Sequence, residues 1–284
     1  MLNGKTLTLT SLAMFAFAGN SILCRLALKT TAIDAASFTS IRLISAAGML
    51  WFILAIRRKV NGIGGSWPSA LSLFIYAAGF SFAYVNLKAG TGALLLFGSV
   101  QTSMISYGLW RGERFTVIQI GGFLLALFGL IILVLPGLSA PPLLSSTLMI
   151  LSGCAWGIYS LRGRGAGDPT IMTAGNFLKT LPMAAVLSLV FWGKMELDPE
   201  GMLFAVASGA ITSGIGYAIW YSALPALKAT QAATVQLSVP VIAAIGGIVL
   251  LAEPLSLRLL LASLAILTGI SCVIFAKVSS PQPS

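Results

Sequence analysis

Long apolar segments separated by short polar ones make up most of this chain. Ten apolar runs can be distinguished, and each is near the length of about 20 residues that a helix needs to cross the hydrocarbon core of a bilayer. Lipid offers no water to backbone N–H and C=O groups, so such segments must be helical. We therefore predict an all-α integral membrane protein with ten transmembrane helices. The runs cover residues 7–28, 35–56, 67–87, 91–110, 116–135, 143–161, 170–192, 201–222, 229–251 and 256–276.

The composition leaves no room for a soluble catalytic domain. Of the 284 residues, 57% are hydrophobic and 8% are charged, and the mean hydropathy is +0.97. Ten spanning helices would occupy roughly 200 positions, which leaves termini and short connections. The chain has no histidine, and Cys24, Cys154 and Cys272 each lie inside an apolar run. We therefore expect no disulfide framework, no metal site and no cofactor.

A membrane-embedded enzyme is the main alternative class. Intramembrane proteolysis or acyl transfer needs paired aspartates, a Ser and His arrangement or a metal site. The chain has no histidine and no pair of acidic residues within an apolar run. We therefore predict a protein that is not an enzyme.

Basic residues outnumber acidic ones, 17 to 7. They lie in short clusters between apolar runs instead of on one basic face, so nucleic acid is not expected as a partner. Their distribution favours cytoplasmic N- and C-termini. With that topology the cytoplasmic loops carry Lys5, Arg57, Arg58, Lys59, Arg111, Arg114, Arg162, Arg164, Lys228 and Lys277. The loops of the opposite face carry Lys29, Lys88, Lys194 and Arg258.

The two halves of the chain resemble each other. A shift of 140 residues aligns Lys88 with Lys228, Glu113 with Glu253 and Thr116 with Ser256, and a shift of 137 aligns Arg42 with Lys179. We predict one five-helix repeat at 1–136, a second at 143–277 and a disordered tail at 278–284. Because five is odd, the second repeat must be inverted, as in carriers that alternate access around a midplane site. Duplication of a purely structural bundle is the alternative.

Three features carry a family resemblance: the loops 112–116 and 252–256, which contain Glu-x-x-Thr and Glu-x-x-Ser, and Trp156-Gly157 at the start of the second half. They resemble the EamA-type branch of the drug/metabolite transporter superfamily, over essentially the whole chain. Within that branch the chain is similar to bacterial amino-acid exporters. The first half departs from the pattern, with Val100 where the second half has Pro240.

The resemblance implies an alternating-access carrier of the bacterial inner membrane. Its expected cargo is amino acids, including aromatic and neutral ones, and related small metabolites, with membrane lipid as its surroundings. Two alternatives stay open. One is another cargo, such as a drug, a nucleotide-sugar or a lipid-linked intermediate, and the other is a partner subunit that does not itself transport.

Two cations lie deep inside apolar runs. Arg42 and Lys179 are roughly 12–14 Å from a helix end, where a positive charge costs roughly 2.5–3.5 kcal/mol on insertion scales. We expect them to face the bundle interior and to attract an anionic group such as a carboxylate. Bonding to helix-end carbonyls, or reaching the interface, is the alternative.

Acidic residues lie only at loops and helix ends. The absence of a carboxylate or histidine inside a run favours a facilitator or an exchanger over a proton-coupled carrier, although Lys179 leaves proton transfer open. Glu113 and Glu253 precede the fifth and tenth runs, where a helix dipole stabilises negative charge, and Thr116 and Ser256 are suited to cap those helices.

Aromatic and amide side chains predict the substrate site. Tyr76, Phe80 and Tyr84 are spaced by four residues, so they share one helix face. With Gln101, in the middle of its run, they are expected to form an aromatic pocket that carries an amide, and ordinary packing is the alternative. The further members of this predicted site are Trp156, Tyr159 and Asn20, together with the cations Arg42 and Lys179.

Overall fold

The structure is a computed structural model that describes residues 4–58, 64–112, 114–137, 140–163, 167–227 and 235–275. Every regular element in these ranges is a helix, in agreement with the predicted fold class. In chain order the elements are α1 (Gly4–Thr30), α2 (Ala35–Ile56), α3 (Trp67–Tyr84), α4 (Ala89–Trp110), α5 (Val117–Val134), α6 (Leu143–Arg162), α7 (Pro169–Val190), η1 (Trp192–Lys194), α8 (Pro199–Val206), η2 (Ala207–Ile215), α9 (Gly216–Ala223), η3 (Leu224–Ala226), α11 (Ser238–Leu251) and α12 (Leu257–Phe275).

Helix occupies each of the ten predicted runs as far as they are described. α8, η2, α9 and η3 follow one another without a break, and together they form the helix predicted at 201–222. The helix predicted at 229–251 is shorter than expected, because α11 begins at Ser238. Residues 228–234 lie outside the described ranges, as does the tail predicted at 278–284.

Among the described residues, 7 helices are long and apolar enough to cross a membrane. α3 and α4 are not among them, because their many Gly, Ser and Thr residues lower the hydropathy. α11 is apolar but has only 14 residues. The seven long apolar helices make the chain a multi-pass membrane protein. Ten crossings stay a prediction.

Side-chain caps fix where several helices begin. At α5 the Thr116 hydroxyl accepts from Gln119 N, and the Gln119 side chain accepts from Thr116 N, which forms a capping box. At α12 the Ser256 hydroxyl accepts from Leu259 N at 3.1 Å. The predicted capping roles of Thr116 and Ser256 are confirmed.

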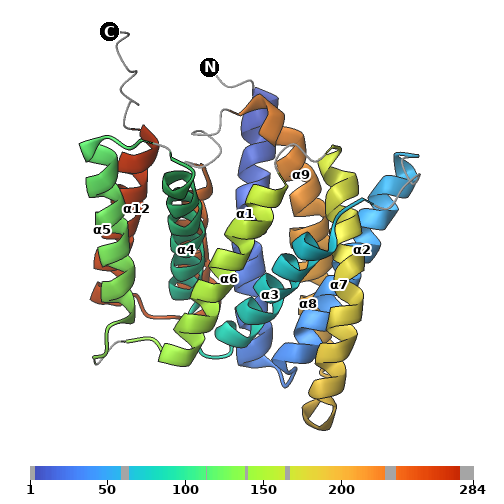
Figure 1. The fold of residues 1–284 in the computed structure, drawn as a ribbon. Helices are drawn as coiled ribbons and strands as arrows, with labels where there is room; N and C mark the ends of the chain where they lie inside the picture. The colour runs from blue at the N-terminus through green and yellow to red at the C-terminus, as the bar shows by residue number, and fades with distance from the viewer. Residues whose placement is uncertain are drawn as a thin grey trace.

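The two halves are interleaved in one bundle (Figure 1). α1 begins at the upper end of Figure 1 and α6 begins at the lower end. α12 ends at the upper end, near the start of α1. We call the upper end the terminal end and the opposite one the far end. The far end carries the α1–α2, α3–α4 and α11–α12 connections.

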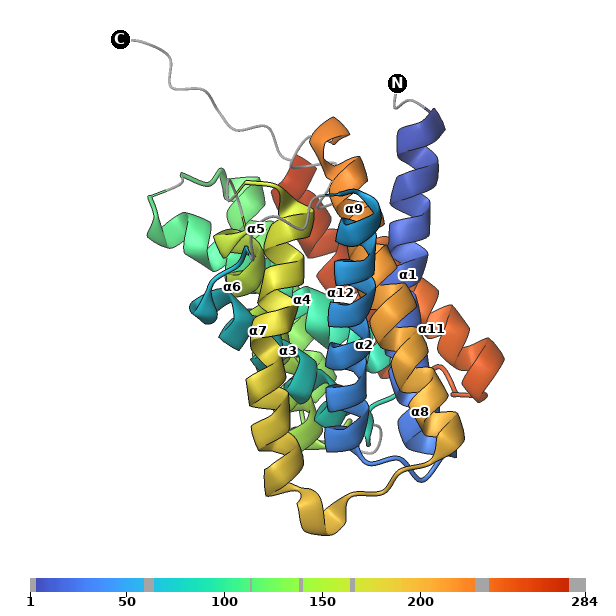
Figure 2. The same cartoon turned by 90° about the vertical axis from the view of Figure 1, so that its right-hand side faces the viewer.

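Contacts between the halves join helices at equivalent positions of the two repeats. α5 packs against α12, α2 against α7, and α4 against α11. Figure 2 shows α2 between α7 and α8, on the side of the bundle away from α5 and α12. α1 packs against α8, η2 and α9, and α6 packs against α3 and α4.

The α5–α12 contact brings two backbones together. A Cβ atom added at Gly122 would lie 2.6 Å from Gly269 O and 2.7 Å from Cys272 Cβ. One residue earlier, Gly121 points away from α12, and a Cβ there would meet nothing within 4 Å. The glycine at position 122 therefore permits close packing of the two helices.

We expect Gly122→Ala to destabilise the protein and Gly121→Ala to leave it almost unchanged. The first change forces a methyl group into a backbone contact, and overpacking of this kind costs about 1–3 kcal/mol. Thermal unfolding in detergent, followed by size-exclusion chromatography of the two variants, measures the difference. Equal melting temperatures would contradict the close contact.

Asp34 joins the two halves at the far end. Its carboxylate accepts from Ala36 N at 2.9 Å, which caps α2, and from Glu196 N at 2.9 Å. Asp34 N donates to Glu196 O in return. Partial burial opposes ionisation, but hydrogen bonds from Ser37, Glu196 and Ala36 outweigh it and hold the pKa of Asp34 below its ordinary value.

The stabilisation by Asp34 should therefore depend on pH. A lowered pKa means that the ionised carboxylate stabilises the folded state above the ordinary pKa of about 3.9. That contribution is lost as the pH falls through the folded-state value. We expect Asp34→Ala to lower the melting temperature at pH 6, and we expect this difference from the wild type to shrink as the pH falls below about 4 toward the folded-state pKa. A constant gap over this range would show that the carboxylate charge has no part in the contact.

Candidate functional site

A closed cavity lies between helices of both halves. α1, α3 and α4 of the first half and α6 and α9 of the second contribute to its wall. The volume open to the centre of a water molecule is about 20 Å³, which suits about one water. A small-molecule cargo therefore needs this cavity to open. Its lining residues are Phe17, Asn20, Tyr76, Phe80, Leu96, Phe97, Trp156 and Tyr217.

Aromatic rings from both halves meet across the cavity. Trp156 of α6 lies 4.8 Å from Tyr76 of α3 and 5.3 Å from Tyr217 of α9, measured between ring centroids. Phe17 of α1 completes the chain of contacts at 5.7 Å from Tyr217. Such distances are typical of attractive ring pairs. The rings offer flat apolar faces to a ligand and link helices that are distant in sequence.

Asn20 anchors an unusual helical segment to α1. Its Oδ1 accepts from Thr212 at 2.6 Å, from Ser208 at 2.8 Å and from Ser213 at 3.2 Å. The three hydroxyls belong to η2, a π-helix of 9 residues. A π-helix has a wider turn than an α-helix, so residues four and five apart point the same way, and such segments are frequent at functional sites.

Arg42 is a buried cation beside this cluster, with 1% of its surface exposed. Its Nη2 donates to the Tyr76 hydroxyl at 3.0 Å and its Nε to the Ser213 hydroxyl at 3.4 Å. The guanidinium carbon lies 4.8 Å from the centroid of the Phe80 ring. Nη1 has no hydrogen-bond partner, and the described residues give Arg42 no acidic one. The positive charge is thus held by hydroxyls and ring faces alone.

Four of the predicted site residues line the cavity: Tyr76, Phe80, Trp156 and Asn20. Tyr159 lies next to Trp156, with ring centroids 5.3 Å apart, and accepts from Asn176 Nδ2 at 3.4 Å.

Gln101 and Lys179 lie elsewhere. Gln101 is 6% exposed but does not line the cavity, where α4 contributes Leu96 and Phe97 instead. Lys179 Nζ donates to Gly64 O at 2.6 Å, in the connection between α2 and α3. A bond to backbone carbonyls was the alternative to the expected attraction of an anionic group by Lys179.

Tyr84 is fully buried on the far-end side of Phe80. The two rings are 4.7 Å apart, and the Tyr84 hydroxyl donates to Ala89 O at 3.2 Å. Its ring packs over Gly92, where any side chain would collide with it. Tyr84 is therefore not a lining residue. It fills the space between the cavity and the α3–α4 connection.

Sequence reasoning missed Phe17, Tyr217 and Ser213 as site residues. Phe17 precedes Asn20 by three positions, so the two share a helix face, and that spacing was a usable signal. Ser213 lies in the π-helix η2, and Tyr217 follows it in α9, so the π-helical geometry changes which residues face α1. An analysis that assumes 3.6 residues per turn throughout cannot predict which of these residues face α1.

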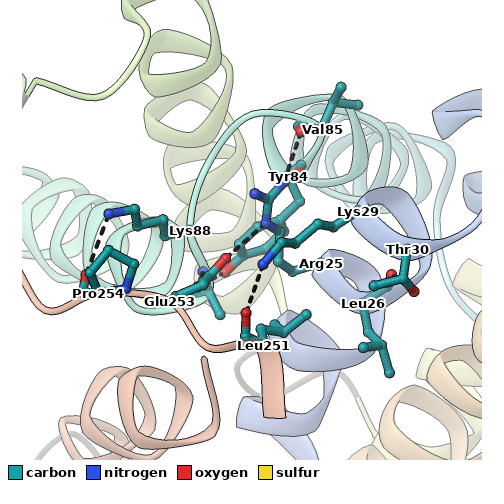
Figure 3. A network of polar contacts seen from close by, with 11 residues as sticks. Arg25, Leu26, Lys29, Thr30, Tyr84, Val85, Lys88, Leu251, Glu253 and Pro254 are labelled. Carbon is teal, nitrogen blue, oxygen red and sulfur yellow. Dashed lines mark hydrogen bonds and ion pairs between the residues drawn. The ribbon is translucent and has the colours of Figure 1, made fainter. Parts of the chain in front are cut away.

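The side-chain contacts of Glu253 lie away from α12, the helix whose dipole was expected to stabilise its charge. Its Oε2 accepts from Ala89 N at 2.7 Å at the start of α4, and its Oε1 forms an ion pair with Arg25 Nε at 2.9 Å (Figure 3). Glu113, its repeat counterpart, lies outside the described residues. Those residues contain no group of three or more His, Cys, Asp or Glu side chains placed to hold a metal.

The Asn20 cluster can be tested by a double-mutant cycle. Asn20→Ala should destabilise the protein, because it leaves the buried hydroxyls of Ser208 and Ser213 without their acceptor, at about 1–3 kcal/mol for each unsatisfied group, and leaves Thr212 only its bond to Ser208 O. Asn20→Ala and Thr212→Val should be strongly non-additive in melting temperature. Ser222→Ala is the matched control, because Ser222 bonds only to Ala218 O of its own helix. Additive effects for Thr212 would exclude the contact.

Comparisons with known proteins agree with this architecture. The EamA-like transporter family matches residues 143–275. An uncharacterized protein of Pseudomonas aeruginosa is 58% identical over 275 residues, which cover 96% of both chains. An uncharacterized transporter of Archaeoglobus fulgidus is 26% identical over 259 residues, 86% of this chain and 88% of the relative.

A similar relationship extends to another bacterium and to a solved structure. An uncharacterized transporter of Bacillus subtilis is 22% identical over 251 residues, 82% of this chain and 85% of the relative. A protein crystal structure superposes with a TM-score of 0.66 at 18% identity and covers 94% of this chain and 96% of its own; this likeness concerns the fold alone. Residues 143–275 are thus similar to the EamA-like transporter family, and relatives described as uncharacterized transporters align with most of the chain.

Proposed function

We propose that this protein is an alternating-access carrier of the bacterial inner membrane that exports amino acids, including aromatic and neutral ones, and related small metabolites. The observation that carries the proposal is the closed cavity between the two halves, which combines ring faces with hydrogen-bond donors. The match of residues 143–275 to the EamA-like transporter family and the exporter resemblance of the loops 112–116 and 252–256 support it.

We further propose that residues 1–136 and 143–277 are inverted repeats with ten crossings in all, with both chain ends in the cytoplasm. The opposite directions of α1 and α6 support the inversion (Figure 1). The pairing of α2 with α7, α4 with α11 and α5 with α12 supports it as well, because a twofold axis brings equivalent elements together. A site at this interface is what alternating access between repeats requires.

The polar groups near the cavity suit a carboxylate. Oδ1 of Asn20 already accepts three hydroxyls, so its Nδ2 is the group left for a ligand, and it is a donor. Nη1 of Arg42 is a second donor, which becomes reachable when Tyr76 and Phe80 move aside. Among the residues that the structure describes, no Asp or Glu lines the cavity. A carboxylate is thereby favoured over a cationic drug.

The rings suit the remainder of an amino acid. Trp156 and Tyr217 can hold an aromatic or aliphatic side chain by stacking and burial, and ring faces also attract an ammonium group. Such contacts need no ionisable acid. A facilitator or an exchanger that moves its cargo down a gradient agrees with this lining.

Counterflow in proteoliposomes tests the proposal. Purified protein is reconstituted with internal unlabelled phenylalanine, tryptophan or alanine, and uptake of the labelled form is followed. We expect exchange above that of empty liposomes. Trp156→Ala should raise the concentration for half-maximal exchange about tenfold, or ~1.4 kcal/mol. Trp192→Ala is the matched control, because Trp192 is 69% exposed and lies outside the cavity.

Two outcomes would contradict the proposal. Folded, reconstituted protein that exchanges no amino acid in a screen of all common ones would exclude this cargo class. Equal exchange by the Trp156→Ala and Trp192→Ala variants would exclude the cavity as the binding site. Exchange of a drug, a nucleotide-sugar or a lipid-linked intermediate in the same assay would identify the cargo class that replaces it.

A further inference from the structure

A network of charged side chains joins three connections at the far end of the bundle (Figure 3). Arg25 and Lys29 come from the last turns of α1, and Lys88 comes from the connection between α3 and α4. Their partners are Glu253 and backbone carbonyls of the α11–α12 connection and of the end of α3. The network therefore crosses from the first half of the chain to the second.

Arg25 is at the centre of this network. Its Nε pairs with Glu253 Oε1 at 2.9 Å, and its Nη1 donates to Tyr84 O at 2.9 Å and to Val85 O at 2.8 Å. The side chains of Arg25 and Glu253 are 12% and 7% exposed. A single guanidinium thus binds α1, the end of α3 and the second half of the protein.

Glu253 extends the contact to α4. Its Oε2 accepts from Ala89 N at 2.7 Å, where the dipole of α4 favours negative charge. Its own N–H donates to Gly247 O, which follows from the left-handed conformation of Ala252, with φ +51°. A Cβ atom on Gly247 would lie 2.9 Å from Glu253 Oε2. The carboxylate is thus held in place by both backbone and packing.

Two lysines strengthen the same seam. Lys29 Nζ donates to Leu251 O at 2.7 Å, where α11 ends, and Lys88 Nζ donates to Pro254 O at 3.3 Å. Cations are favoured at the end of a helix, where carbonyls have no partner. Together with Arg25, the two lysines hold the α11–α12 connection against the first half.

Tyr84 links this network to the cavity. Its carbonyl accepts from Arg25, while its ring packs on Phe80, a lining residue. On α1, Arg25 follows the lining residue Asn20 by five positions, roughly 7.5 Å along the helix axis. The ion pair therefore lies directly beyond the cavity, on the side away from the chain ends, and Tyr84 fills the space between them.

We propose that the Arg25–Glu253 ion pair is a gate that closes the far end of the cavity and must separate each time the carrier opens to that face. The inference rests on the proposed alternating access. Separation frees the α11–α12 connection from α1 and α4 and allows Tyr84 to leave the space between the cavity and the α3–α4 connection. It also returns both charges to water, so that the pair contributes chiefly to the closed state.

The terminal end is closed by contacts of a different kind. There Lys179 donates to Gly64 O at 2.6 Å, Asn176 accepts from Ser66 N at 2.9 Å and Arg162 Nε donates to the Ser69 hydroxyl at 3.2 Å. Each of these is a single bond to a neutral acceptor or donor. Weakening the ion pair should therefore shift the protein toward a state open at the far end.

A native cysteine can report this opening. Cys24 precedes Arg25 on α1 and is fully buried, whereas Cys154 and Cys272 are partly exposed. In a Cys154→Ser, Cys272→Ser background, a membrane-impermeant maleimide added to intact cells reaches Cys24 only when the far end opens. Glu253→Gln removes the charge and keeps an oxygen for Ala89 N. We expect it to raise the labelling rate about tenfold, as for loss of a charged hydrogen bond.

Glu196→Gln is the matched control. Glu196 is an exposed acid on the connection from α7 to α8, at the same end, and the contact it makes with Asp34 is through its backbone. It should label at the wild-type rate. Arg25→Lys is a second test, since it keeps the charge but loses the fork that holds Tyr84 O and Val85 O; we expect an intermediate rate.

One outcome of the labelling experiment would contradict the gate. If folded Glu253→Gln or Arg25→Lys protein labels no faster than Glu196→Gln, although unfolded protein labels completely, the ion pair does not hold the far end closed. The assay needs no cargo. Faster labelling without amino-acid exchange would support the gate and exclude the proposed cargo. Amino-acid exchange without faster labelling would support the cargo and exclude the gate.

Discussion

The architecture around the cavity depends on the contact of the Asn20 amide with three hydroxyls of η2. In a bilayer no water satisfies a buried polar group, so each one must find its partner within the protein. Asn20 Oδ1 serves Ser208, Thr212 and Ser213 at once, which is possible because the π-helix turns all three toward α1. Ser213 also accepts from Arg42, and Arg42 in turn holds Tyr76. The position of the cavity wall thus follows from a single hydrogen-bond acceptor.

The two arginines Arg42 and Arg25 have different surroundings. In the middle of the bundle Arg42 has only hydroxyl and aromatic neighbours, so the site keeps an unmatched positive charge that a ligand can complement. At the far end the charge of Arg25 is matched by Glu253, and that pair contributes to closure. In the proposed mechanism the same residue type serves binding in one place and closure in another, according to whether it has an acidic neighbour.

Much of the fold could be predicted from the sequence, because hydropathy and turn residues determine where helices lie in a membrane chain. The caps at Thr116 and Ser256 and the aromatic face of Tyr76 and Phe80 also followed from local spacing. Contacts between distant segments did not. Glu253 was assigned to the helix next to it in sequence, but it binds α4, which is 164 residues away along the chain. Gln101 was favoured for its depth in a run, and nothing local shows that the cavity lies one turn nearer the start of α4.

The glycine contact between α5 and α12 limits how such a protein can change shape. Gly122 and Gly269 bring the two backbones together with no side chain between them, and the helices belong to different halves. Sliding or separation of the two helices would disrupt this close backbone packing, whereas a small rotation would not. The pair is thus suited to act as a hinge, with the largest displacement on the side of α2, α7 and α8 that faces the viewer in Figure 2. With such a hinge, a small rotation at one edge of the bundle opens a wide passage at the opposite edge.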